Sequence, residues 1–371
     1  MKLKGLIAAE CKRKRLFHAL WVGLKWLTLA MVCVEVFSFL VITATNFLVF
    51  GQPWEGSRVN YDAYAIFLNV DGVQPTLHNP ADPDASEGKE APRHLWLLGG
   101  STVRGGWVEA SKTIPSYLAE MINQPGNSEK VVVTNYGENS FNSLLETKYL
   151  QKLFIETAKP PDLVIFYDGA NDCSYFNLYR TPQAHYGYRR LQGLIQSYRQ
   201  SYFSLFKPLD NALYSSYTLE IFDRFRQTVV PVYPNNPAPR EFVAETEKRY
   251  EHVRKLAGAY GAKFLLVWQP ILWVETGKVD PLVKEQEKSL DIMGAKFLRV
   301  RENFATTYDL LAASLEDKPY FVDFRNALCP RKTPVYESDG VYLKPRGNRM
   351  VAIRLVGMLK DRGWLKNGGG N

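Results

Sequence analysis

The sequence lacks the glycine-rich motifs with which many α/β proteins bind phosphate groups. No segment reads GxGxxG, and the glycine turn LGGSTVRGG at 98–106 has no GKS or GKT ending. Both motifs wrap backbone N–H groups around phosphates, so their absence excludes a phosphate loop of either kind. The sequence also has no internal repeat, which excludes a repeat architecture.

Excess charge is scarce beyond the N-terminus. The chain carries a net charge of +8 from 46 Lys and Arg against 38 Asp and Glu. Residues 1–20 hold six basic side chains and one acidic side chain, so this short segment accounts for +5 of that total. The rest of the chain shows no basic footprint, and we expect no nucleic-acid partner.

A long apolar run, WLTLAMVCVEVFSFLVITATNFLVF at Trp26–Phe50, follows the basic segment. As a helix, this run would measure about 37 Å, which is enough to cross a membrane. No small-x-small cleavage site follows it, and it is too long for an ordinary signal core, so we expect an uncleaved anchor. The positive charges ahead of it predict a cytoplasmic N-terminus and a periplasmic globular domain, on a single-pass protein of the inner membrane.

One acidic residue, Glu35, interrupts the apolar run near its middle. An ionised carboxylate is costly at that depth and usually finds a protein partner. Two interpretations follow. The glutamate is protonated and tolerated within a single span, or it marks a contact between this helix and another membrane protein.

Short apolar segments alternate with helical patterns through the rest of the chain. We predict strands in the segments 94–100, 130–137, 162–172 and 262–270, with a fifth at 320–324. Such alternation indicates a three-layer α/β/α, flavodoxin-like fold with a parallel sheet, whose sites form at the carboxyl ends of the strands. The predicted regions are a basic tail (1–25), an anchor (26–50), a stalk and loop (51–94), the α/β domain (95–363) with an aromatic-rich insertion (173–239), and a tail (364–371).

Four segments at predicted strand ends carry polar side chains suited to acyl chemistry. GGST presents Ser101 on a tight glycine turn, NYGENS contains Ser140, GAND contains Asn171, and DGVYLKPRGN begins with Asp339 ahead of a helix. An exposed hydroxyl on such a turn is a candidate nucleophile, and an amide donor is a candidate oxyanion ligand.

Together and in this order, these segments resemble the sequence blocks of the SGNH (GDSL-like) hydrolase family over residues 95–363. The resemblance implies that Ser101 is the nucleophile. It also implies that Asn171 and the backbone N–H of Ser140, where the family usually has glycine, stabilise the oxyanion. Asp339 would orient the base. We expect no metal and no cofactor.

The last segment departs from the family pattern, which is Asp-x-x-His. Here Tyr342 stands three residues after Asp339, where the histidine is expected. A phenol with a pKa near 10 is a poor base at neutral pH, and the loss of a triad histidine costs on the order of 10⁴–10⁶ in turnover. His185, which follows the GAND turn, is a candidate replacement base or an ordinary loop residue.

Two cysteines flank these blocks in the sequence. Cys173 lies two residues after Asn171, and Cys329 lies ten residues before Asp339. A location outside the cytoplasm permits a disulfide. We predict a bridge between them, with two free thiols as the alternative.

Two classes of function remain open from the sequence. The first is a catalytically impaired, SGNH-like subunit that binds a ligand or assembles a membrane complex. The second is an O-acyl (acetyl) esterase or acyltransferase acting on cell-envelope carbohydrate through Ser101. Anchored members of the family often work beside membrane-bound O-acyltransferases, so the resemblance implies an integral membrane partner in either case.

Overall fold

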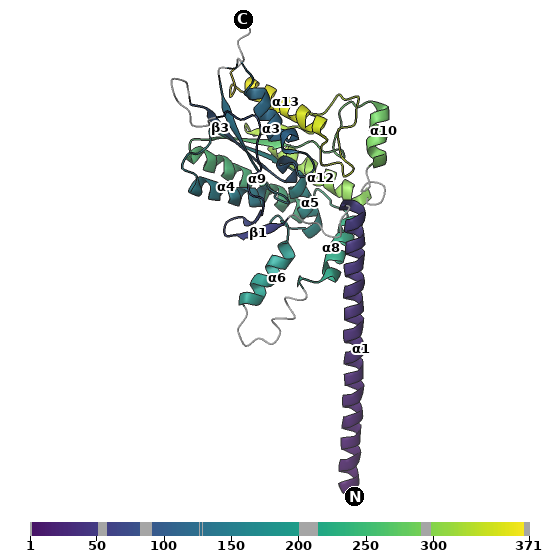
Figure 1. Cartoon of the computed structure of the whole chain (residues 1–371). Helices are drawn as coiled ribbons and strands as arrows, with labels where there is room; N and C mark the ends of the chain where they lie inside the picture. The colour runs from purple at the N-terminus through teal and green to yellow at the C-terminus, as the bar shows by residue number, and fades with distance from the viewer. Residues whose placement is uncertain are drawn as a thin grey trace. The chain divides into compact units, whose positions relative to one another are not determined.

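The structure is a computed structural model that describes residues 2–50, 58–81, 91–125, 127, 129–199, 214–290 and 298–366. The chain forms two compact units (Figure 1). The first comprises Met1–Glu55 with Arg189–Phe225, and the second comprises Gly56–Tyr188 with Arg226–Asn371. Much of the aromatic-rich insertion therefore groups with the N-terminal helix.

A five-stranded parallel sheet forms the centre of the second unit, in the order β4-β3-β5-β6-β7. The strands are β3 (Arg93–Gly99), β4 (Val131–Gly137), β5 (Leu163–Asp168), β6 (Lys263–Trp268) and β7 (Phe321–Asp323). All five lie in segments that the apolar runs predicted. The chain runs from β3 to β4 on one side and then to β5 on the other, so a crevice is expected at the carboxyl ends of β3 and β5.

Side chains alternate along the strands and enter two separate cores. Trp96 and Leu266 join the first core, whereas Leu97 and Val267 join the second. The first core includes residues of α4 (Ser143–Glu156), α5 (Ala170–Tyr179), α9 (Pro237–Ala259) and α12 (Leu298–Leu315). The second includes residues of α3 (Ile114–Ile122) and α13 (Pro345–Asp361). Helices on both faces of a parallel sheet confirm the predicted three-layer fold.

Shorter elements complete the second unit. They are the antiparallel strands β1 (Val59–Asp62) and β2 (Ile66–Asn69), helix α2 (Ser101–Arg104), the 3₁₀ turn η1 (Ala110–Lys112) and helix α10 (Pro281–Leu290). The β1–β2 pair lies where the sequence predicted only a stalk and a loop. Four-residue strands of mixed composition carry too weak a period to stand out in a sequence.

The first unit contains α1 (Lys2–Phe50) and most of α6 (Tyr188–Arg199) and α8 (Tyr217–Val229). Within α1, residues Lys12–Leu48 are long and apolar enough to cross a membrane. The basic segment that the sequence predicted as a tail is therefore continuous with the apolar helix.

Glu35 has bonding partners within its own unit. Its carboxylate accepts hydrogen bonds from the backbone N–H of Tyr217 at 2.5 Å, the backbone N–H of Thr218 at 3.1 Å and the Thr218 hydroxyl at 2.7 Å. The ring of Phe39 packs edge-on against Tyr217 at 5.1 Å. Glu35 thus binds the N-terminal N–H groups of α8, where a negative charge is stabilising. The predicted contact of Glu35 with a second membrane protein stays a prediction.

Candidate active site at the switch point of the sheet

Ser101 is the first residue of α2 and follows β3 through Gly99 and Gly100. The turn leaves no room for a side chain at Gly100. A Cβ on Gly100 would lie 2.7 Å from the side-chain nitrogen of Asn171. The glycine therefore allows the amide of Asn171, at the carboxyl end of β5, to approach the serine turn.

The two segments enclose a cavity of about 20 Å³, the serine cavity. Its polar lining includes Ser101, Thr102, Asp168, Asn171, Asp172 and Gln269. Phe141, Tyr167 and Val341 complete much of the wall. The predicted nucleophile and the predicted amide donor thus meet at the crevice between β3 and β5, in a space that admits about one water molecule.

The predicted oxyanion donors, Asn171 and Ser140, lie on α5 and on the turn after β4, and their role stays a prediction. The Asn171 amide donates to the carbonyl of Phe141 at 2.6 Å, so it is already hydrogen-bonded. Ser140 has φ of 64°, a left-handed conformation that suits the glycine of the family pattern. The Tyr175 hydroxyl donates to the Ser140 carbonyl at 3.1 Å. The serine therefore adopts a glycine-like backbone shape at this turn.

Asp339 organises the loop that closes the other side of the site. Its Oδ1 accepts hydrogen bonds from the backbone N–H groups of Val341 and Tyr342, each at 3.0 Å. Burial raises the pKa of Asp339, and these two N–H groups oppose that rise. The carbonyl of Gly340 accepts a bond from the N–H of Leu272 at 2.9 Å, which joins this loop to the segment after β6.

The ring of Tyr342 packs against Trp107, with ring centroids 5.0 Å apart and an interplanar angle of 31°. Val341 is the residue of this loop that lines the serine cavity in the described part of the chain. The occupation of the family's histidine position by Tyr342 stays a prediction. The aromatic contact with Trp107, which is 47% exposed, was not visible in the sequence.

The structure does not bring the candidate base His185 to the serine cavity. Its Nδ1 lies 2.7 Å from the carbonyl of Tyr186, and its ring packs edge-on against Tyr188 at 5.7 Å. Burial lowers the pKa of His185. Across the residues that the structure describes, no histidine lines the cavity. The position of His185 therefore favours the ordinary loop residue.

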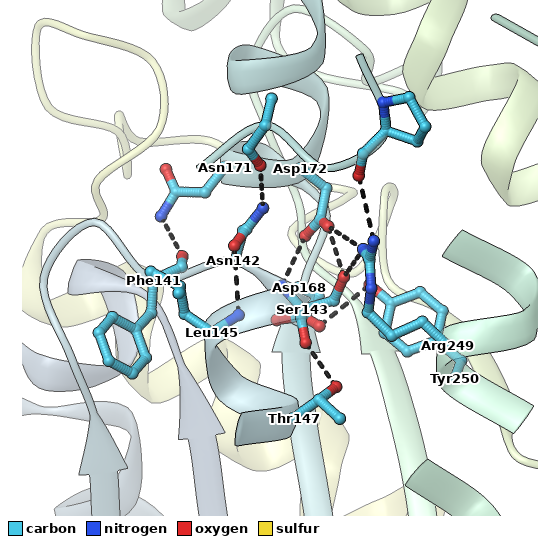
Figure 2. A network of polar contacts seen from close by, with 12 residues as sticks. Phe141, Asn142, Ser143, Leu145, Thr147, Asp168, Asn171, Asp172, Arg249 and Tyr250 are labelled. Atoms are coloured by element: carbon cyan, nitrogen blue, oxygen red, sulfur yellow. Dashed lines mark hydrogen bonds and ion pairs between the residues drawn. The ribbon is translucent and has the colours of Figure 1, made fainter. Parts of the chain in front are cut away.

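A buried polar network supports the site from below (Figure 2). The Ser143 hydroxyl donates to Asp172 at 2.5 Å and accepts from the Arg249 guanidinium at 2.8 Å. Arg249 also lies 3.6 Å from Asp172, and the Tyr250 hydroxyl donates to Asp168 at 3.0 Å. The network joins α4, α5 and α9 to the end of β5. No local sequence pattern predicts this network, because neither Arg249 nor Tyr250 lies near Asp172 in the sequence.

The carboxyl groups of this network are hard to ionise. Burial raises the pKa of Asp168 to about 7, and the charge of Asp172 adds to the rise. Burial also raises the pKa of Glu146 well above its ordinary value, with Asp168 as the next cause. Burial raises the pKa of Asp172 as well, and Arg249 opposes that rise. Asp168 and Asp172 line the serine cavity, so burial disfavours negative charge on its floor.

The predicted disulfide between Cys173 and Cys329 is wrong, because both are free thiols. Cys173 is completely buried on α5 within the first core. Cys329 lies beside Gly277, with its sulfur 3.7 Å from the Arg331 guanidinium. The two thiols therefore pack into different surroundings.

No family model matches the chain, and no curated protein matches it. Similar solved structures include a lipase/acylhydrolase from Enterococcus faecalis, which is 17% identical in sequence with a TM-score of 0.37. The match covers 73% of this chain and 96% of the lipase/acylhydrolase chain. A member of the lipolytic G-D-S-L family from Veillonella parvula DSM 2008 is 16% identical with a TM-score of 0.37, and the match covers 72% of this chain and 98% of that protein's chain. The psychrotrophic esterase EstA from Pseudoalteromonas sp. is 11% identical with a TM-score of 0.38, and the match covers 74% of this chain and 100% of the esterase chain.

Proposed function

We propose that this protein is a membrane-anchored, extracytoplasmic SGNH-like subunit that binds an acylated carbohydrate and hydrolyses esters only very slowly. One observation carries the proposal. Ser101 and Asn171 share a cavity, whereas its described lining contains no histidine. The residue at the histidine position of the family pattern, Tyr342, packs its ring against Trp107.

The chemistry explains why such a site binds better than it reacts. A serine hydroxyl needs a neighbouring base to become a useful nucleophile at neutral pH. Phenols titrate near pH 10 and supply little base below that. The cavity still offers a hydroxyl and an amide that can hold an ester carbonyl, so recognition of the acyl group survives the loss of the base.

The membrane part of the proposal rests on α1. The basic residues ahead of its apolar stretch favour a cytoplasmic N-terminus, which leaves the α/β unit outside the inner membrane. Glu35 binds the first turn of α8, so the polar group in the apolar helix is compensated within the chain. We place an integral membrane protein of the O-acyltransferase type, or another membrane complex, as the partner.

The test of impaired catalysis restores the histidine. Tyr342→His should raise the hydrolysis of p-nitrophenyl acetate by the full-length protein in detergent by at least about 100-fold, a small part of what a triad histidine contributes. Ser101→Ala in the same background should remove the gain. Tyr342→Phe is the matched control, because it keeps the ring on Trp107 and supplies no base.

The retained Ser101 and Asn171 favour the alternative, an active O-acetyl esterase or acyltransferase. A wild-type turnover of about 1–10³ s⁻¹ on small acetyl esters, abolished by Ser101→Ala, would establish that alternative and exclude the impaired site.

The topology has its own measurement. Protease applied to the cytoplasmic face of inverted vesicles should leave the α/β unit intact, and cleavage there would overturn the orientation.

A further inference from the structure

A second and larger pocket lies beside the loop that carries Asp339. It has a volume of about 210 Å³ and is called the basic pocket here. Its lining includes Leu272, Trp273, Lys284, Lys288, Arg301 and Arg331. They come from the segment after β6, from α10, from α12 and from the loop after β7.

The basic pocket and the serine cavity share one stretch of chain. Gln269 lines the serine cavity, and Leu272 and Trp273 line the basic pocket a few residues later. The same stretch is tied to the Asp339 loop, because the N–H of Leu272 donates to the carbonyl of Gly340. A group bound in the basic pocket therefore contacts the segment after β6, and the start of this segment forms part of the wall of the serine cavity.

The charges in the basic pocket are unequal. Arg331 is already neutralised, since its guanidinium pairs with Glu275 at 2.7 Å and with Glu287 at 2.5 Å. Lys284 and Lys288 are exposed, four residues apart on α10, and thus on one face of that helix. Within the described residues, neither lysine makes an ion pair. The two lysines therefore line the basic pocket without an acidic partner among the described residues.

An aromatic ring and a third cation complete the pocket. The guanidinium of Arg301 lies over the indole of Trp273, 5.4 Å from the ring centroid. Trp273 packs edge-on against Phe304 at 5.3 Å, which holds the ring in place. A half-buried aromatic surface beside several cations suits a ligand with a ring-sized body and a negative charge, because the body covers apolar surface and the charge relieves the repulsion among the cations.

We propose that the basic pocket binds an acidic sugar residue, a pyranose ring that bears a carboxylate, of the carbohydrate whose acyl group is held at Ser101. The inference rests on the proposed function and specifies its ligand as an anionic polysaccharide. Lys284 and Lys288 supply the charge that selects the carboxylate, and Trp273 supplies the surface for the ring.

The experiment is a calorimetric titration of the full-length protein in detergent at low salt. Tetragalacturonate serves as the acidic probe, cellotetraose as the neutral probe and inorganic phosphate as the small anion. The acidic tetramer should bind at least about tenfold more tightly than the neutral one. Lys284→Gln with Lys288→Gln should weaken that binding by about three- to thirtyfold, since each exposed ion pair contributes modestly.

The matched control removes two exposed lysines elsewhere in the second unit, through Lys263→Gln with Lys360→Gln, and should leave the affinity unchanged. Equal binding of the acidic and neutral tetramers, or equal affinity of the two double variants, overturns the proposal. Lysine-dependent binding of phosphate with no binding of the acidic tetramer also overturns it, in favour of a phosphate site. These readouts measure binding, so they stand or fail independently of the turnover gained by Tyr342→His.

Discussion

The two halves of the serine site are supported in different ways. The strand-end half, which comprises Ser101, Ser140 and Asn171, sits on β3, β4 and β5 above the buried network of Asp172 and Arg249. The loop half, residues 337–342, is held by backbone bonds to Asp339 and by the contact of Tyr342 with an exposed tryptophan. The half with buried support holds the predicted nucleophile and the predicted amide donor, whereas Tyr342 lies in the other half.

The contrast has a physical reason. A change in the strand-end half disturbs charges and hydrogen bonds that are shielded from water, where an unpaired group is expensive. A change at position 342 alters a side chain whose contact is partly exposed, so it changes the chemistry at little cost in stability. A substitution in the loop half is therefore expected to leave the fold intact.

The largest expected effect follows from removing the cation of the buried network. Arg249→Met should lower the free energy of unfolding by about 3–5 kcal/mol, because it leaves the buried Asp172 without its ion-pair partner. Denaturant unfolding of the full-length protein measures this. Arg254→Met on the same helix removes an exposed pair with Glu251 and should have a much smaller effect on the free energy of unfolding. Equal losses in the two variants would remove the distinction between the halves.

The second expectation concerns pH. The folded protein holds a proton on Asp168 up to about pH 7, whereas an unfolded aspartate loses it near pH 4. The folded state therefore binds more protons between these values, and the contribution of Asp168 to stability falls as the pH rises through this window. Asp168→Asn, which keeps an acceptor for Tyr250, should abolish that part of the decline. Parallel stability profiles of wild type and variant from pH 4 to 8 would contradict it.

The third expectation concerns the glycine-like turn of the strand-end half. Ser140→Val should cost about 1–2 kcal/mol, because a β-branched residue resists the left-handed conformation that Ser140 adopts. Ser140→Gly should cost less, since glycine enters that region freely. Thermal unfolding of the pair checks the order, and a glycine variant less stable than the valine variant would show that the turn does not require this conformation.

The smallest expected effect lies in the loop half. In a double-mutant cycle of Trp107→Ala and Tyr342→Ala, the two rings should couple by about 0.5–1.5 kcal/mol, the usual value for an aromatic pair. The single change Trp107→Ala should cost little more than this coupling, because the side chain is 47% exposed. A much larger coupling would mean that the loop half is as firmly supported as the strand-end half.

The sequence by itself determined the order of the strands along the chain, the apolar helix and the positions of Ser101 and Asn171. Each of these depends on a local signal. Buried strands are short apolar runs, a membrane helix is a long one, and a glycine turn follows the strand whose end it forms. The carboxyl ends of parallel strands meet at one edge of the sheet, so those two residues could be placed together from the sequence.

Only the tertiary structure decided which distant side chains complete the site. Arg249 reaches Asp172 from α9, Tyr342 finds Trp107 on another loop, and Lys284 shares a pocket with a tryptophan from the segment after β6. The disulfide prediction failed for the same reason, because the position of a cysteine in the sequence does not specify the surroundings into which its thiol packs. Such contacts depend on how helices pack over the sheet, and the local pattern of the sequence does not specify which side chains then meet.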